Sequence, residues 1–520
     1  MSASKEKKTR QDPAAQGLSE REQKRLKEAQ DARRSSILYG TVGIICVVAA
    51  IFLVIWNTGI IQRNATAVTI NGTKYTAADA QYYFNSTRLN VLNFYYSNMG
   101  MLPFNTSIST KDQVYDSTTG QTWYDYLMGQ TLDTMTLYAA ATDKAHEEGY
   151  TISAETQQQL ESDLAELDTA WEGTTYSSRD AYIRGTFGPY MTYDRLVELY
   201  TDTYYVQDYL DSITTGFTYT EDDYQAYYEE NADSLDSFTM TQFVCLAQVS
   251  TTDEEGNAIE MTEDEKAAAL EEEKAEAKAL AEEIMAKLEA GEDAQSLADT
   301  YSEQLYSYDI SDVRTGSNVN TSYSEWAFDP ARQPGDLTLA EYDSESSSYY
   351  YYVVRFENRE RDDDPTHDVR HILISPETDG DGTEATDEQK AAAKAKAEEL
   401  LEQWKVGGST EDSFAALAQT ESADTVSAAE GGLISGITPT SSYVESFRDW
   451  AVDPSRKIGD TGIVESSYGY HIMYYVGDGD PVWKSTVDAN LRSADYDTWE
   501  TATREGYSAS TGIGLKFLQV

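Results

Sequence analysis

One short motif occurs twice in this chain. The sequence WAFDPARQPGD (Trp326–Asp336) returns as WAVDPSRKIGD (Trp450–Asp460), with seven of eleven residues identical at an offset of 124. The run SLADTYSEQ likewise corresponds to ALAQTESAD 120 residues later. Such self-similarity indicates a duplicated structural unit. We therefore expect two tandem copies of one unit, at 236–361 and 364–480, rather than a single core for all 520 residues.

Both units have the pattern of an α+β fold. In the second unit, an apolar strand at 368–374 is followed by a helix starting near Thr386, where Gln389 has capping-box spacing. The unit closes with GDTGIVESSYGYHIMYYV, which alternates like a hairpin. The first unit opens with the strand FVCLAQV, and Thr262 and Glu265 form the equivalent capping pair at the start of its long helix.

A continuous apolar run occupies 37–61, which is 25 residues without a charge. This length spans a bilayer as a tilted helix. The basic tail before it, 1–36, places the N-terminus in the cytoplasm. A cleaved signal peptide would have a shorter apolar core, and a lipoprotein would have a small residue before Cys46, where Ile45 stands. We expect an uncleaved single-pass anchor with the rest of the chain outside the cell membrane.

The chain is strongly acidic, with a net charge of −52 at pH 7. This charge argues against nucleic acids and anionic membrane surfaces as partners. It is compatible with cationic or neutral polypeptide clients, and equally with a merely solvated surface. Cys46 and Cys245 cannot pair across the predicted membrane boundary. An external protein of this size without a disulfide is typical of bacteria that do not rely on oxidative folding outside the cell.

Residues 66–235 are predicted to be mostly helical after a short strand-and-turn opening, AVTINGTKYTAADAQYYF. The Asn71-Gly72 step suits a two-residue hairpin turn, and Thr76 suits a helix N-cap. Helical patterns follow near 121–148, 153–170, 178–213 and 220–232. We expect most tyrosines of these helices to lie in a core rather than to contact a client.

Two of the four histidines lie in short apolar strand patterns 100 residues apart. His371 lies in VRHILIS and His471 in GYHIM, at the two ends of the second unit. With this spacing and the elements between, the unit resembles the parvulin family of peptidyl-prolyl isomerases. The resemblance implies an antiparallel sheet with flanking helices in both units. The opening of 66–235 is similar to the N-terminal chaperone region of extracytoplasmic foldases of the PrsA and SurA type, in which a C-terminal tail, here 481–520, often completes that region.

The resemblance also implies an active site. His371 and His471 would be the two facing histidines of the family, with Asp424 beside them and the Ser466 hydroxyl near the second histidine. A purely structural pair of buried histidines is the alternative. Two histidines and an aspartate could also suggest zinc, but a zinc site would need a further ligand or water position and supporting partners. We expect no metal and no cofactor.

The proline pocket follows from the same resemblance. Phe447 would form its aromatic floor, Tyr443 would stand where most members have methionine, and Ile434 would take the place of a leucine. The stretch GGLISGITP departs from the usual GGDLG pattern around this last position.

The first unit lacks the polar residues of the second. Cys245, Gln304 and Tyr352 are expected in place of the first histidine, the aspartate and the second histidine. A cysteine there could be a reactive thiol, but a small apolar strand residue is the simpler interpretation. We expect this unit to keep the fold and lose the catalysis.

These features together predict a membrane-anchored, extracytoplasmic foldase that isomerises X–Pro bonds and holds unfolded secreted polypeptides. A non-catalytic holdase is the alternative, and a structural spacer in the cell envelope a third. The loop SPETDGDGTEATDE after the first strand of the second unit is acidic, which argues against phosphoserine-directed isomerisation. Nothing in the sequence indicates the oligomeric state.

Overall fold

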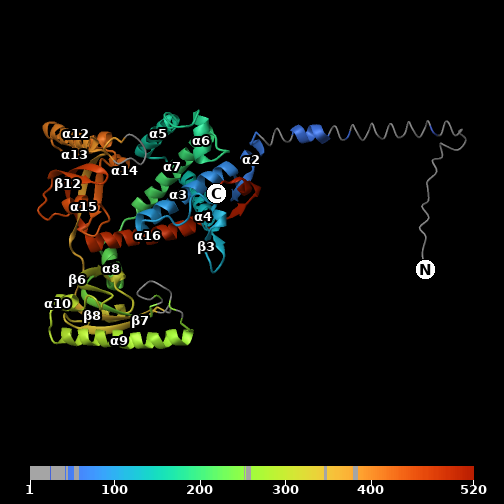
Figure 1. Cartoon of the computed structure of the whole chain (residues 1–520). Helices are drawn as coiled ribbons and strands as arrows, with labels where there is room; N and C mark the ends of the chain where they lie inside the picture. Colours follow the sequence, from blue (N-terminus) through green and yellow to red (C-terminus); the bar gives the residue numbers. More distant parts are fainter. Residues whose placement is uncertain are drawn as a thin grey trace, which may run out of the picture. The chain divides into compact units, whose positions relative to one another are not determined.

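The computed structural model describes residues 24, 41, 45–51, 58–250, 252, 259, 261–344, 348–378 and 385–520 (Figure 1). The predicted tail at 1–36 and most of the predicted anchor at 37–61 lie outside these residues. No helix within the described ranges is both long and apolar enough to cross a bilayer. The chain divides into two compact units that are larger than the repeated copies. From here on, the first unit is Met1–Ser212 with Trp499–Val520, and the second unit is Ile213–Thr498. The copies at 236–361 and 364–480 are the first and second halves of this second unit.

The first unit begins with an antiparallel hairpin. Strands β1 (Thr66–Ile70) and β2 (Thr73–Thr76) are joined by a turn in which Asn71 and Gly72 have φ angles of 46° and 86°. A two-residue hairpin turn with positive φ at both positions favours Asn-Gly, as the sequence predicts. Strand β13 (Ala509–Thr511) pairs with the other edge of β1, so the sheet order is β13-β1-β2.

Helices form most of the first unit. Two long helices, α3 (Ala77–Met99) and α4 (Trp123–Glu148), both begin at a threonine that forms a capping box with an aspartate three residues later. The other elements of this unit are α2 (Ile60–Asn64), η2 (Thr110–Asp112), β3 (Val114–Asp116), β4 (Gln121–Thr122), α5 (Ala154–Thr169), α6 (Arg179–Phe187), α7 (Tyr193–Gly216) and η4 (Ile513–Phe517).

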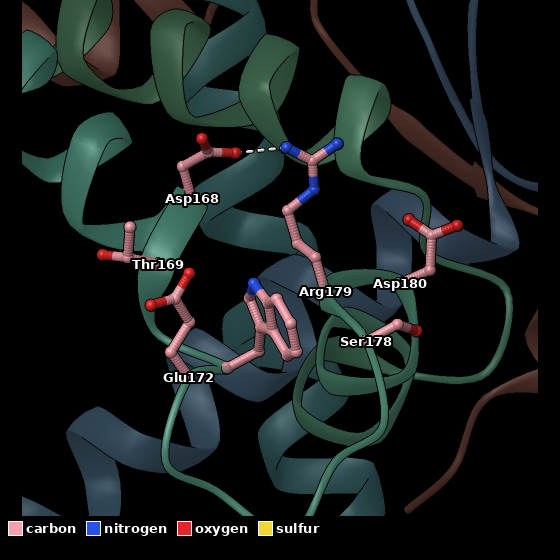
Figure 2. A pocket seen from close by; sticks show the side chains of 7 residues that line it. Asp168, Thr169, Glu172, Ser178, Arg179 and Asp180 are labelled. Atoms are coloured by element: carbon pink, nitrogen blue, oxygen red, sulfur yellow. Dashed lines mark hydrogen bonds and ion pairs between the residues drawn. The ribbon is translucent and has the colours of Figure 1, made fainter.

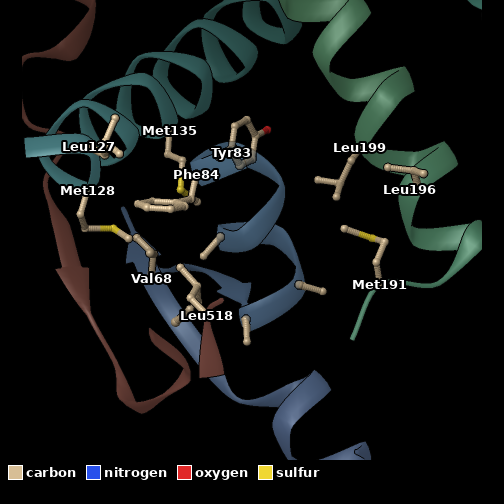
Figure 3. Close-up of a cluster of buried hydrophobic side chains, with 14 of the residues drawn as sticks. Val68, Tyr83, Phe84, Leu127, Met128, Met135, Met191, Leu196, Leu199 and Leu518 are labelled. Atoms are coloured by element: carbon tan, nitrogen blue, oxygen red, sulfur yellow. The ribbon is translucent and has the colours of Figure 1, made fainter. Parts of the chain in front are cut away.

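The core of the first unit joins residues from both of its chain segments. Phe84 of α3 and Leu127 of α4 are fully buried in it, together with Leu199 of α7 (Figure 3). Leu518, from the C-terminal segment, lies in the same cluster. Each such side chain contributes about 1.5–3 kcal/mol when it is removed from water, so the C-terminal segment stabilises this unit through packing as well as through β13.

The second unit contains two antiparallel sheets with the same strand order. The first has the order β6-β5-β8-β7 and the second β10-β9-β12-β11. Each sheet therefore has its first and last strands paired at the centre. The strands are β5 (Ser237–Gln248), β6 (Ser307–Thr315), β7 (Leu337–Asp343), β8 (Ser348–Glu360), β9 (Pro365–Ile374), β10 (Leu433–Ile437), β11 (Thr461–Ser466) and β12 (Gly469–Pro481).

The helices of this unit follow the same sequence order in each half. The predicted capping pairs form complete capping boxes at Thr262 and Thr386. The helices are α8 (Glu221–Leu235), α9 (Glu263–Glu289), α10 (Ala294–Tyr301), η3 (Gly316–Asn318), α11 (Ser324–Phe328), α12 (Asp387–Val406), α13 (Glu411–Glu421), α14 (Thr425–Ala429), α15 (Glu445–Ala451) and α16 (Val482–Arg504).

Helix α8 belongs to the second unit, although the sequence pattern assigns it to the helical region at 66–235. Its Leu235 packs against Trp483 and Val487 of α16. This apolar contact joins α8 to α16, and no local pattern in the sequence of α8 indicates it.

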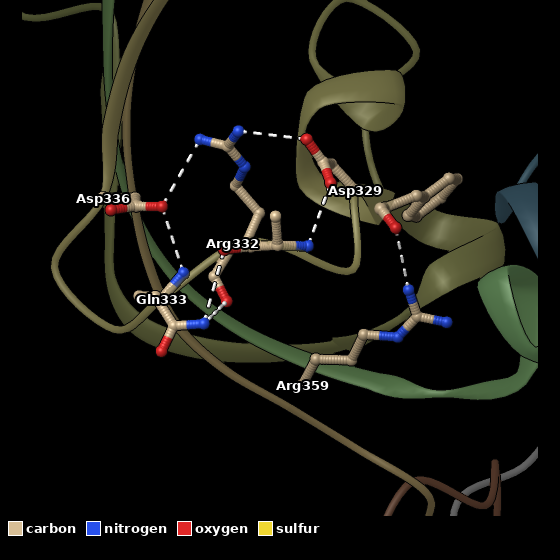
Figure 4. Close-up of polar contacts among 7 residues, drawn as sticks. Asp329, Arg332, Gln333, Asp336 and Arg359 are labelled. Carbon is tan, nitrogen blue, oxygen red and sulfur yellow. Dashed lines mark hydrogen bonds and ion pairs between the residues drawn. The ribbon is translucent and has the colours of Figure 1, made fainter.

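The repeated motif forms the same turn in both halves. In the first copy, Asp329 accepts a hydrogen bond from the Ala331 N–H (2.9 Å) and pairs with Arg332 (3.2 Å), while Asp336 accepts from the Gln333 N–H (3.0 Å; Figure 4). The carboxylates thus satisfy backbone donors that the turn leaves free.

The second copy repeats these contacts. Asp453 accepts from the Ser455 N–H (2.9 Å) and pairs with Arg456 (3.3 Å), and Asp460 accepts from the Lys457 N–H (2.9 Å). The aspartates and the arginine shared by the two motifs therefore build a turn.

Candidate active site

The two predicted histidines lie on the central strands of the second sheet. His371 on β9 is opposite Met473 on β12, and His471 is two residues before Met473, so both imidazoles are on the same face. Both are buried, at 3% and 5% exposure. Their Nδ1 atoms are 3.2 Å apart. Strand pairing thus brings together two residues 100 positions apart in the sequence.

A carboxylate and a hydroxyl lie at the outer nitrogen of His371. Its Nε2 is 2.9 Å from Asp424 Oδ2 and 2.9 Å from Ser427 Oγ, and the serine hydroxyl donates to Asp424 at 2.7 Å. Asp424 is the N-cap of α14, and it accepts from the Ser427 N–H as well. Ser427 was not predicted from the sequence. Its spacing of three from an aspartate N-cap is the signal that could have indicated it.

Ser466 lies at the outer nitrogen of His471, so a row of hydrogen-bonded side chains runs from Ser466 through His471 and His371 to Asp424. Its Oγ is 2.7 Å from His471 Nε2 and accepts a hydrogen bond from the Tyr468 N–H at 3.1 Å. The hydroxyl hydrogen of Ser466 is therefore left to donate to the imidazole.

The hydrogen-bond partners determine which atom donates and which accepts at each contact of the row. Since Asp424 only accepts, His371 Nε2 carries the hydrogen and its Nδ1 is an acceptor. His471 Nδ1 must then donate, which leaves His471 Nε2 to accept from the Ser466 hydroxyl. Every donor in the row has an acceptor when both imidazoles are neutral.

The pKa values favour this state. Burial lowers the pKa of His371, which the hydrogen bond and charge of Asp424 only partly offset. Burial, followed by the charge of His371, lowers the pKa of His471 to about 4. Burial raises the pKa of Asp424, but hydrogen bonds from Ser427 and His371 outweigh it and the net pKa is lowered. At neutral pH the histidines are neutral and the carboxylate is charged.

An apolar floor lies against the histidine pair. The Phe447 ring, 2% exposed, has its centroid 5.2 Å from the rings of both histidines. Tyr443 is 5.5 Å from Phe447 and 41% exposed, so it lies at the solvent edge. Ile434 packs against the same cluster. The structure thus brings all seven predicted site residues into one region.

Other buried residues of this cluster were not predicted. Strand alternation indicates which side of each strand they occupy, but the pairing needed to identify them is not visible in the sequence. They are Val369, Ile437, Ala451, Val464, Met473 and Tyr475.

In the first sheet, the position of His371 is taken by Gln242, which corrects the expectation for Cys245. Phe356 bonds to its motif turn through Gly335 as Tyr475 does through Gly459. Two residues before Phe356, Val354 is opposite Gln242. Cys245 is three residues further along β5, and an odd shift puts a side chain on the opposite face. It is buried in the cluster under α9, and burial raises the pKa of its thiol to about 12.

The remaining positions of the first half contain tyrosines. Tyr352, four residues before Phe356, takes the place of His471, and its ring is 5.9 Å from that of Tyr323. The Tyr323 hydroxyl donates to Gln242 Oε1 at 2.8 Å. Gln304 is exposed in the loop after α10. This half therefore has a packed Tyr–Tyr–Gln cluster where the other has two histidines.

A cavity of about 420 Å³ lies in the first unit near the loop between α5 and α6 (Figure 2). Arg179, which lines this cavity, forms an ion pair with Asp168 (Figure 2). Its Cζ also lies 3.7 Å from the centroid of the Tyr193 ring. None of the predicted site residues lines it, so it is not part of the histidine site. In the described ranges, no group of three His, Cys, Asp or Glu side chains could hold a metal ion.

The histidine row and its aromatic floor place residues 364–480, the second half of the second unit, in the parvulin class of peptidyl-prolyl isomerases. Residues 351–476 match the family described as the PPIC-type PPIASE domain. This match confirms the class predicted from the sequence: the chain carries a parvulin-type peptidyl-prolyl isomerase domain. No curated protein matches the chain.

Several solved structures are similar to the chain. The chain covers 63% of the peptidylprolyl isomerase PrsA from Bacillus anthracis with 31% of its own length (21% identity, TM-score 0.18). It covers 93% of PrsA from Bacillus subtilis with 76% of its length (12% identity, TM-score 0.29). It covers 79% of a chain from the study of the SurA-like chaperones PEB4 and Cj1289 of Campylobacter jejuni with 67% of its length (13% identity, TM-score 0.15). At these scores the structures add no assignment beyond the family match.

Proposed function

We propose that this protein is an extracytoplasmic foldase whose 364–480 unit isomerises X–Pro bonds in unfolded secreted polypeptides. The row from Ser466 through His471 and His371 to Asp424, beside the Phe447 floor, carries the proposal. Every polar group of the row already has a hydrogen-bond partner within the site. A client proline ring that packs against the floor would therefore meet no unpaired buried donor.

Isomerisation needs little covalent chemistry. The barrier of about 18–20 kcal/mol comes from amide resonance, and an uncatalysed X–Pro bond takes tens to hundreds of seconds to rotate. The planar amide is the more polar form, so an apolar pocket that excludes water favours the twisted amide. Phe447 would hold the proline ring, and the neutral histidines would present no charge that stabilises the planar form.

The experiment is an isomerase assay of the full chain with an Ala-Pro peptide, comparing the wild type with His471→Ala. His367 is the matched control, since it also lies on β9 but bonds to Tyr475, with Nδ1 and Oη 2.8 Å apart. The proposal expects loss of turnover in His471→Ala and its retention in His367→Ala. Equal turnover in all three proteins would favour the non-catalytic holdase.

We propose that residues 236–361 are a non-catalytic copy of the same domain. The common strand order and the twice-built motif turn support this. The Tyr–Tyr–Gln cluster lacks a group that titrates near neutral pH and fills the position of the histidine pair.

The proposed location rests on the sequence. The 25-residue apolar run at 37–61 would anchor the chain in the cell membrane, with the basic tail at 1–36 inside and everything after about residue 64 outside. External protease on intact cells should digest the region beyond 66 and spare the tail. Recovery of a mature protein without the apolar run would contradict the anchor.

A further inference from the structure

A second cavity, of about 190 Å³, lies within the first unit. Its walls come from the β1–β2 hairpin, from α3, α4 and α7, and from the C-terminal segment. An apolar cavity of about 150 Å³ is large enough for benzene, whereas drug-sized ligands occupy about 300–1,000 Å³. This cavity is therefore suited to one side chain of a polypeptide and too small for a nucleotide-sized cofactor.

Four tyrosines form the aromatic part of its lining, Tyr75, Tyr83, Tyr138 and Tyr507. The rings of Tyr83 and Tyr138 meet edge to face, with centroids 6.0 Å apart. Tyr83 is only 7% exposed, and its oxygen is directed away from Phe84 and Met135 of the core (Figure 3). Among the described residues its hydroxyl has no hydrogen-bond partner, although buried phenol hydroxyls normally have one.

The charged side chains of the lining that are not in an ion pair are negative. Asp202 of α7 lines it and is exposed, and within the described part of the chain it forms no ion pair or hydrogen bond. Asp143 also lines it and accepts from the Tyr507 hydroxyl at 2.8 Å. The cation of the lining, Arg195, is already bound to Asp79 at 2.7 Å.

We propose that this cavity binds the side chain of a lysine or arginine in an unfolded polypeptide. A cation is attracted by the faces of the tyrosine rings, and its N–H groups can donate to both Asp202 and the Tyr83 oxygen. An apolar side chain would leave the buried Tyr83 hydroxyl without a partner and would displace water from the Asp202 carboxylate, and an anion would be repelled by Asp143 and Asp202. The inference rests on the proposed chaperone role, for which it names the client side chain.

The test is a binding measurement with the full chain and three fluorescent, unstructured, proline-free peptides. They are identical except that the test positions hold lysine, glutamine or leucine. The lysine peptide should bind at least tenfold more tightly than the other two. Asp202→Asn should remove most of this preference, and Tyr83→Phe, which deletes only the free hydroxyl, should reduce it about threefold.

Asp194→Asn is the matched control. Asp194 is exposed on the same helix α7 but does not line the cavity, and its substitution changes the net charge equally. Binding by this variant should match the wild type. An equal loss in Asp194→Asn and Asp202→Asn, or equal binding of all three peptides, would overturn the inference. The cavity variants must also keep the melting temperature of the wild type, which the conservative Tyr83→Phe is expected to do.

A second readout separates this inference from the chaperone proposal. Suppression of aggregation of an unfolded, lysine-poor and arginine-poor protein should be the same for the wild type and Asp202→Asn. Suppression by both proteins without any lysine preference would overturn the cavity site alone. Failure of both proteins to suppress aggregation or to bind any peptide would overturn the chaperone role and the cavity site together.

Discussion

His371 and His471 share a single hydrogen between Nδ1 atoms that are 3.2 Å apart on neighbouring strands. One ring must donate and the other accept, so the two imidazoles cannot both be protonated without breaking the contact. Asp424, at the far nitrogen of His371, decides which ring donates. Protonation of one ring therefore lowers the proton affinity of the other.

Removing the second histidine should abolish most of the catalysis. His471→Ala leaves His371 Nδ1 and the Ser466 hydroxyl without their partner, so we expect kcat/KM for an Ala-Pro peptide to fall at least tenfold, or about 1.4 kcal/mol of transition-state stabilisation. Asp424→Ala should act in the same direction, because it releases the tautomer of His371. Each variant must first show an unchanged melting transition. Full activity in either folded variant would contradict the assignment of the site.

The pH profile should reflect the lowered pKa values. The histidine row is complete only when both rings are neutral and the pKa values of both are lowered, so kcat/KM should not fall at the pH where a free histidine titrates. It should then fall as the pH approaches the pKa of His471, about 4. A midpoint near 6.5, the value of a free histidine, would show that the imidazoles are not buried as a neutral pair.

The free energy of unfolding should also depend on pH through His471. In the unfolded chain a histidine titrates near 6.5 and binds protons below that pH, whereas folded His471 stays neutral down to about 4. The stabilisation is therefore complete above pH 6.5 and is lost as the pH falls to 4, by on the order of 3 kcal/mol. Denaturant unfolding of the wild type and of His471→Ala at pH 7.5 and 4.5 should show a smaller pH effect in the variant.

The aromatic floor should act through substrate binding. Phe447→Leu keeps an apolar surface but removes the flat ring under the proline, so KM should rise several-fold with a smaller change in kcat. Leucine is preferable to alanine because truncating a buried phenylalanine costs about 3–5 kcal/mol of stability. Tyr443→Phe, at the exposed edge, should change neither constant. A fall in kcat alone for Phe447→Leu would assign the ring a different role.

The first half of the second unit should contribute no turnover. Giving the second half the residues of the first, with His371→Gln and His471→Tyr in one chain, should remove isomerase activity from the full-length protein. Residual turnover above the uncatalysed rate would show that 236–361 is catalytic.

Phosphorylation of the substrate should weaken turnover. The loop SPETDGDGTEATDE follows β9 and carries a strong negative charge, although 379–384 within it lie outside the described residues. A phosphoserine before proline adds about −2 charge and should be repelled. A preference for the phosphopeptide over the serine peptide would contradict this prediction.

The seven site residues were expected from the resemblance of residues 364–480 to parvulins, and strand pairing and packing bring them into one region. Equivalence between the two halves was harder to predict. Cys245 and Gln242 are three residues apart in one apolar strand, and only the pairing with β8 shows which of them faces the site. Ser427 was missed because a serine three residues after an aspartate is common, and its role depends on the cap of α14. The cavity beside Tyr83 joins three helices and two distant segments, which no local pattern reveals.

The pairing of β1 with β13 has a consequence for the order of folding. Thr69 is opposite Ser510, about 440 residues later, so synthesis of the chain delivers the entire second unit before the first can close. Loop-closure entropy grows only logarithmically with length, so this separation adds little to the final stability. Until β13 emerges, however, one edge of β1 remains unpaired and open to other strands. The isomerase domain is continuous in sequence and can fold first, and the N-terminal unit is then completed last.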